Sequence, residues 1–169
     1  MSSITPFQIA IPNEKLTRLQ QQLSLYDFPA NDTTIDQTWV RGPPVSHVKR
    51  LAHYWQHSFN WREVEARLNE LPQFMANVEV DDFGAYDIHY VHQKSQRTRA
   101  IPLLFVHGWP GSFLEVTKML PLLSQVREDG GPAFHVVAPS LIDFGFSSAN
   151  TKVEPSLGEC PQIMLISHF

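Results

Sequence analysis

The chain has 169 residues, a formal net charge of -4 and 43% hydrophobic residues, enough for one ordinary globular domain with a core. Acidic and basic residues are interspersed, which argues against a nucleic-acid partner, and no apolar run reaches the length needed to cross a bilayer. The N-terminus lacks signal-peptide features, and the single cysteine, Cys160, can form neither an internal disulfide nor a zinc site. Composition therefore predicts a soluble, cytoplasmic protein with no membrane anchor.

Apolar residues recur at helical spacing in three stretches of the first 75 residues, which predicts three amphipathic helices. The stretches are residues 16–23, 45–59 and 61–71. His53 and His57 have a spacing that can hold a metal, but they lie opposite the apolar stripe, so a solvated face is the better interpretation. The tryptophans of this region are interpreted as packing residues: Trp39, Trp55 and Trp61. Because the helices have no obvious core of their own, we interpret them as an accessory arm that packs on something larger.

From Asn77 onward the pattern changes from helical spacing to alternation, which is typical of strands. Val78 and Val80 alternate with acidic residues. After Gly84, residues 86–92 alternate again. Two alternating segments separated by a short glycine-containing link predict a β-hairpin.

Two further strands and a helix are expected in the second half of the chain. Residues 101–106 are apolar on both faces, as in a strand inside a parallel sheet, and residues 134–138 form a shorter candidate strand. A helix is expected between them, from Ser112 to about Leu123, with Pro121 kinking or ending it. The order of strand, helix and strand favours an α/β unit.

The most informative motif is His107-Gly108-Trp109-Pro110-Gly111, which joins the strand at 101–106 to the expected helix. Ser112 and Glu115 follow with the spacing of a capping box. On spacing alone, a plain Gly/Pro turn between a buried strand and a capped helix is the simpler interpretation, because many α/β proteins have one. The loop at 139–147 lies where open α/β sheets place ligands, but by itself it is a weak signal.

Several stretches together resemble the microsomal-type epoxide hydrolase family. The stretches that resemble its N-terminal domain, in order and spacing, are residues 7–12, 54–55, 59–62, 65–69 and 71–74. Those that resemble the opening of its α/β-hydrolase domain are residues 88–92, 102–115 and 134–141. The resemblance covers roughly residues 7 to 152, and this extent favours a functional interpretation of the turn over the plain one.

The resemblance implies an α/β fold in which a helical N-terminal arm is followed by an incomplete α/β-hydrolase sheet. It also implies a two-step reaction, in which an aspartate opens an epoxide to an alkyl-enzyme ester and a histidine held by an acid activates the water that cleaves it. His107, Gly108, Trp109 and Pro110 match the family's oxyanion-loop motif, with the Trp109 backbone N–H as donor and its ring lining the pocket. The implied partner is a small-molecule epoxide, and no metal or organic cofactor is implied, because the mechanism needs only side chains and water.

The chain departs from the family pattern in two places. The usual Pro-Gly-Tyr-Gly-Phe-Ser loop stands here as residues 142–147 without the proline and the first glycine, but Asp143 tolerates a positive φ, so the turn is expected to survive. Beyond Lys152 the resemblance stops, and the nucleophile, acid, base and cap regions have no counterpart. We therefore expect three parts, namely a helical arm at 1–75, the first part of an α/β-hydrolase domain at 76–152 and a divergent tail at 153–169.

The missing regions predict a truncated chain that is poorly stable and inactive alone. The strand at 101–106 would lie mid-sheet in a complete fold, so without a neighbour it is expected to form an exposed edge that pairs with other chains. Epoxide hydrolysis by family is the leading interpretation. Another α/β-hydrolase reaction, such as ester or haloalkane hydrolysis, is one alternative, because the oxyanion loop is shared more widely than the arm. A non-catalytic interaction protein, which binds through the exposed edge and the arm, is the other.

Overall fold

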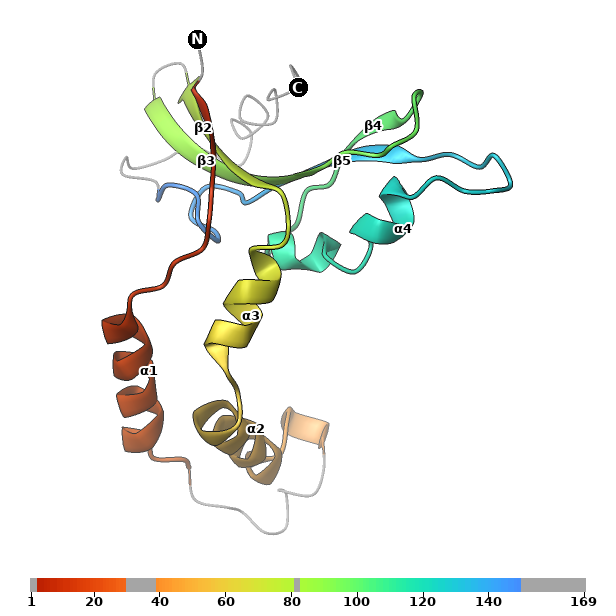
Figure 1. Ribbon diagram of the computed structural model, residues 1–169. Coiled ribbons are helices and arrows are strands. Elements are labelled where there is room, and N and C mark those ends of the chain that lie inside the picture. The colour runs from red at the N-terminus through yellow and green to blue at the C-terminus, as the bar shows by residue number, and fades with distance from the viewer. Residues whose placement is uncertain (1–2, 30–38, 81–82, 150–169) are drawn as a thin grey trace. The chain divides into compact units, whose positions relative to one another are not determined.

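The computed structural model describes residues 3–29, 39–80 and 83–149, and the tail expected at 153–169 lies outside them. The elements in chain order are β1 (Ile4–Pro6), α1 (Asn13–Leu25), η1 (Trp39–Arg41), α2 (Val45–His57), α3 (Trp61–Leu68), β2 (Gln73–Val80), β3 (Gly84–Gln93), β4 (Ile101–Leu104), η2 (Phe113–Val116), α4 (Leu120–Ser124) and β5 (Phe134–Pro139). Two compact units emerge: a helical unit, Ile9–Leu68, and a sheet unit formed by the residues up to Gln8 together with those from Asn69 on (Figure 1). The domain limits expected at residues 75 and 152 remain predictions.

The sheet unit is built on five strands in the order β1-β2-β3-β5-β4. β2 and β3 form the predicted antiparallel hairpin, in which Val80 pairs with Gly84 and the glycine takes a φ of 89° that other residues rarely adopt. β3 also pairs antiparallel with β5, whereas β5 pairs parallel with β4. The sheet is therefore mixed, and together with the helices it confirms the predicted α/β class.

The first strand lies in a segment that was expected to belong to a helical arm, and that part of the expectation is wrong. Ile4 pairs with Ala76 and Pro6 with Phe74, in an antiparallel ladder between β1 and β2. Three exposed residues are too few to show a periodicity in the sequence. The strand forms because β2, on the far side of the helical unit in sequence, offers it an unpaired edge.

β4 lies at the edge of the sheet, as expected, and among the described residues β5 is the strand that pairs with it. Ile101 and Leu104 are 51% and 45% exposed. The N–H groups of Ile101 and Phe105 donate to carbonyl oxygens at and just before β5, so the backbone groups of Pro102 and Leu104 face the open side. Because proline has no N–H, the open edge presents fewer donors than an ordinary strand.

The helical unit contains the three predicted helices, α1, α2 and α3. α1 and α2 begin directly after Pro12 and Pro44, whose extended backbones lead into the first turn without a side-chain cap. Neither helix buries a residue, and Trp39 and Trp55 are 63% and 45% exposed. The Trp39 ring nevertheless contacts the His47 ring, with 5.2 Å between centroids, so the interpretation of these tryptophans as packing residues stays a prediction.

Glu65 is the polar centre of the helical unit. One carboxylate oxygen, Oε1, accepts the Ile11 N–H at 2.7 Å and the Trp61 indole N–H at 3.2 Å. The Arg62 guanidinium pairs with Oε2 and donates to the Ile11 carbonyl at 2.7 Å. The Ile11 N–H and then Arg62 hold the pKa of Glu65 below its ordinary value. This carboxylate thereby joins the segment before α1 to α3.

The helix expected from Ser112 to about Leu123 is split in two, which corrects that prediction. The short 3₁₀ turn η2 comes first, capped by the Ser112 hydroxyl, which accepts the Leu114 N–H at 3.3 Å. α4 follows, and Pro121 stands in its first turn instead of ending a helix. A proline is well suited to that position, because a first-turn N–H has no partner within the helix.

A small hydrophobic cluster lies where β2 meets β3. It consists of the buried residues Val80, Tyr86 and Ile88, with Val78, Phe83 and Ile142 packed against them. On the other side of β3, His89 and Val91 are also buried, so this strand is covered on both faces.

The helices of the described ranges include none with the length and apolar character that a membrane span requires.

Candidate active site

The predicted turn follows β4, and it lies beside the loop that follows β5. Because these two strands are parallel, their carboxyl ends meet at the same edge of the sheet, and so do the two loops. The Gly111 N–H donates to the Gly108 carbonyl at 2.7 Å, which closes a tight turn around Trp109 and Pro110, with a cis peptide bond between those two. Trp109 is 86% exposed, and the role of its ring in a pocket stays a prediction.

His107 holds the start of this turn from inside the protein, since it is only 4% exposed. The Leu141 N–H donates to His107 Nε2 at 3.2 Å. Because Nε2 is the acceptor, the proton of the neutral ring is on Nδ1, which donates to the Gly108 carbonyl at 3.3 Å. The Phe144 ring packs edge-on against the imidazole, with 5.1 Å between centroids. His107 thus contacts both loops at once.

The loop after β5 makes a tight turn of its own. Asp143 has a φ of 67° and Gly145 a φ of 55°, so the expectation that an aspartate takes the left-handed conformation here is confirmed. The Asp143 N–H donates to the Ser148 carbonyl at 3.1 Å, and the Ser147 hydroxyl donates to the Ser140 carbonyl at 2.7 Å. The turn therefore survives without the proline and the first glycine of the family's usual loop.

A fully buried histidine supports this loop from β3. His89 Nε2 donates to Gln73 Oε1 at 3.0 Å, and the Ser140 hydroxyl donates to His89 Nδ1 at 2.9 Å. Three phenylalanine rings surround the imidazole, with centroids 4.8 to 5.4 Å away: Phe7, Phe113 and Phe146. Burial lowers the pKa of His89 from 6.5 to about 4. The ring is therefore neutral at pH 7, and both of its nitrogens are engaged.

The chemical group that this arrangement offers to a ligand is the Trp109 backbone N–H. No residue of the described ranges accepts a hydrogen bond from it. A free N–H on a fixed turn can donate to an oxygen that gains negative charge during a reaction. The two buried histidines nearby, His107 and His89, have both ring nitrogens occupied and are not available as a base. Among the described residues, no group of three or more side chains is arranged to hold a metal ion.

Comparison with known proteins decides the family. A family model described as the epoxide hydrolase N terminus matches residues 4–116, which is more than half of the chain. The chain belongs to the epoxide hydrolase family. It is 39% identical over 170 residues to juvenile hormone epoxide hydrolase 2 of Ctenocephalides felis, and this alignment covers 99% of the chain and 34% of that enzyme.

Solved structures of epoxide hydrolases share the same fold. The juvenile hormone epoxide hydrolase of the silkworm Bombyx mori is 25% identical, with a TM-score of 0.84 over 98% of this chain and 43% of that one. The Aspergillus niger epoxide hydrolase is 33% identical, with a TM-score of 0.68 over 92% and 38% of the two chains. The observed sheet is thus part of an α/β-hydrolase fold, as predicted, and the chain spans about a third of the length of its curated relative.

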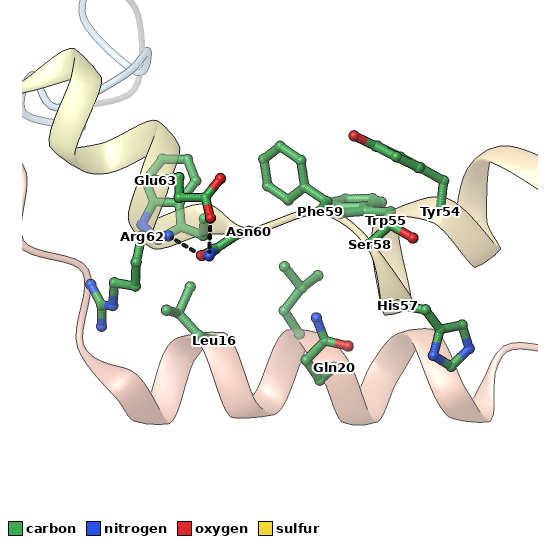
Figure 2. Close-up of a pocket in the computed structure, with 12 residues that line it drawn as sticks. Leu16, Gln20, Tyr54, Trp55, His57, Ser58, Phe59, Asn60, Arg62 and Glu63 are labelled. Atoms are coloured by element: carbon green, nitrogen blue, oxygen red, sulfur yellow. Dashed lines mark hydrogen bonds between the residues drawn. The ribbon is translucent and has the colours of Figure 1, made fainter.

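A cavity of about 910 Å³ lies in the helical unit and includes none of the four predicted site residues. Figure 2 shows Leu16 and Gln20 of α1 on one side of it, and Tyr54, Trp55 and Phe59 on the other. Half of its twelve lining residues are aromatic or aliphatic, and the other half are polar or charged. Because the cavity contains no residue of the predicted oxyanion-loop motif, the turn remains the candidate site.

Sequence reasoning located the turn but missed what holds it. His107 to Pro110 stand together as the motif predicts, whereas the Leu141 N–H was not foreseen, because a backbone donor leaves no signal in the sequence. The supporting position of His89 was missed as well. The alternation of β3 places it on the same face as Val91, and this was the one available sign that a polar ring is buried.

Proposed function

We propose that this chain supplies the oxyanion loop of an epoxide hydrolase, with the Trp109 N–H as one of its donors. The reaction joins water to a small-molecule epoxide and gives a vicinal diol. A carboxylate attacks an epoxide carbon, the C–O bond opens, and the departing oxygen takes a proton. Activated water then attacks the ester carbonyl, and the tetrahedral intermediate collapses to the diol and the free carboxylate.

The observation that carries the proposal is the Trp109 N–H, which donates to no described residue and lies on a turn fixed from both sides. The Trp109 N–H would donate in the second step, in which the ester carbonyl oxygen becomes an oxyanion. Family membership supports the choice of an epoxide over other electrophiles, because the N-terminal arm belongs to the matched part of the chain. Ester or haloalkane hydrolysis has no comparable support from the arm.

A chimera tests the proposal. Residues 3–149 of this chain replace the matching third of the Ctenocephalides felis enzyme, which supplies the other regions. We expect the chimera to convert styrene oxide, or a juvenile hormone of the kind named for that relative, to its diol. The product is measured by chromatography. A folded chimera that forms no diol from either epoxide contradicts the proposal.

Two variants of the chimera test the donor itself. Trp109→Pro removes the N–H, and we expect ester cleavage to slow by about 10²- to 10³-fold, so that the alkyl-enzyme accumulates and is seen by mass spectrometry. Trp109→Phe keeps the N–H and serves as the control. Only a folded site forms the ester, so accumulation also excludes simple misfolding. Normal ester cleavage in Trp109→Pro would remove the assigned role.

A second candidate function has its own observation. The open edge of β4, with Ile101 and Leu104 about half exposed, is a surface on which another chain can add a strand. Association with a defined stoichiometry, measured by light scattering over a concentration series, would favour such an interaction protein. A particle mass that keeps increasing with concentration, without a fixed stoichiometry, would indicate aggregation through the same edge.

A further inference from the structure

His107 stands between the two loops that meet at the carboxyl ends of β4 and β5. We propose that His107 is a positioning residue, which latches the turn bearing the Trp109 N–H to the loop after β5 through the Leu141 N–H. The inference rests on the proposed function for the meaning of the Trp109 donor. The geometry of the latch can be measured without any substrate.

The two ring nitrogens of His107 have different partners. Nε2 accepts the Leu141 N–H at 3.2 Å, and Nδ1 donates to the Gly108 carbonyl at 3.3 Å. One nitrogen must accept and the other must donate, which only the neutral ring with the proton on Nδ1 can do. Burial and the edge contact with Phe144 fix the plane of the ring. The imidazole is therefore a bridge with a fixed direction.

The far side of the bridge is anchored to the sheet. The Ser148 N–H donates to the Asp87 carbonyl at 2.8 Å, and the Asp87 N–H donates to the Ser148 hydroxyl at 2.9 Å. One residue earlier, the Ser147 hydroxyl accepts the His89 N–H at 3.0 Å. These bonds hold the loop after β5 on β3, so the Leu141 N–H is presented from a rigid frame.

The bond between the His107 ring and the Gly108 carbonyl sets the direction of the Trp109 N–H. The Gly108 carbonyl and the Trp109 N–H belong to the same trans peptide unit, in which the two bonds point in opposite directions. Two donors hold that carbonyl, the Gly111 N–H at 2.7 Å and the His107 ring. Fixing the carbonyl on the protein side therefore directs the Trp109 N–H to the opposite side, away from these two donors.

The experiment uses NMR on the full isotope-labelled chain. The wild type should show a scalar coupling across the hydrogen bond between the Leu141 amide nitrogen and His107 Nε2. His107→Phe keeps a ring against Phe144 but has no nitrogen. We expect it to speed exchange of the Leu141 N–H about tenfold and to shift the Trp109 amide signal. His107→Gln offers an acceptor near the place of Nε2 and should restore protection at Leu141.

A matched control is available at the other end of β5. His135 Nδ1 also accepts a backbone N–H, that of Ser95, at 3.1 Å. His135→Phe should expose the Ser95 N–H and leave the Trp109 signal unchanged. Absence of the Leu141–His107 coupling in the wild type overturns the proposal whether or not any variant folds. An unchanged Trp109 signal in a folded His107→Phe also overturns it. A chimera without hydrolytic activity would overturn the proposed function and leave these NMR results standing.

Discussion

Acid should destabilise the sheet unit through His89. Its ring is fully buried, donates to Gln73 and accepts from Ser140, and has no counter-charge among these partners. Burial lowers its pKa to about 4, whereas an unfolded chain has the ordinary value of 6.5. The unfolded state therefore binds a proton at a higher pH than the folded state does.

The size and the window of the effect follow from these two pKa values. The neutral ring contributes its full stability above pH 6.5, and this contribution is lost as the pH falls from 6.5 toward about 4. The gap of about 2.5 pKa units corresponds to about 3 kcal/mol of unfolding free energy. The steepest slope is about 1.4 kcal/mol per pH unit, between the two values.

Urea unfolding, followed through the NMR amide signals of β3, measures this contribution at several pH values from about 7 to about 4.5. The pKa of His92 is also lowered, first by burial and then by Lys94 and His135, so the wild-type slope contains more than His89. The informative quantity is the difference between the wild type and His89→Gln, in which the amide replaces the ring without titrating. Parallel pH profiles of the two proteins would refute the reasoning.

An exposed histidine gives the matched control for this comparison. His53 lies on α2 in the helical unit, where its ring contacts the ring of His57 at 4.4 Å between centroids. His53→Gln makes the same chemical replacement outside the sheet unit. The β3 signals of this variant should follow the wild-type profile.

Three further substitutions test other parts of the structure. Gly145→Ala should lower the free energy of unfolding in urea by about 2 kcal/mol, because the residue has a left-handed φ and its new Cβ would lie 2.5 Å from a serine hydroxyl. Gly130→Ala, which has a left-handed φ but open space around it, should lower it by about 1 kcal/mol. Glu65→Gln should lower the urea midpoint of the helical unit, measured by tryptophan fluorescence at pH 7, more than the control Glu63→Gln does. The difference between the two midpoints should shrink as the pH falls below 4.5 toward the lowered pKa of Glu65. Equal midpoints at pH 7 would refute the central role of Glu65. Leu104→Lys should weaken concentration-dependent association in light scattering, because a charge on the open edge opposes strand pairing; unchanged association would exclude β4 as the contact.

The parts of the fold that sequence predicted are those with a repeated pattern. The hairpin at β2 and β3 and the three helices follow from periods of two and about 3.6 residues, which burial imposes over many positions. β1 could not be found this way, because three exposed residues repeat nothing. The split between η2 and α4 was missed because the apolar spacing continues across it, whereas the regular helical conformation of the backbone does not.

The candidate site was predictable only as a motif. His107 to Pro110 were identified from a resemblance, and Asp143 from the known tolerance of aspartate for a positive φ. The bond from the Leu141 N–H joins a side chain to a backbone group far along the chain. Such bonds depend on where two loops meet in space, so composition and spacing carry no trace of them.

The position of β1 makes the helical unit, Ile9–Leu68, an insertion between β1 and β2, here called a cassette. Pro6 pairs with Phe74, and the Phe7 N–H donates to the Gln73 carbonyl at 2.9 Å, so the polypeptide leaves the sheet and returns to it at neighbouring positions. We therefore expect that replacing residues 9–68 with a short linker would leave the strand register unchanged. The same junction allows the cassettes of two relatives to be exchanged, so that what the helices contribute can be separated from what the sheet and its turns contribute.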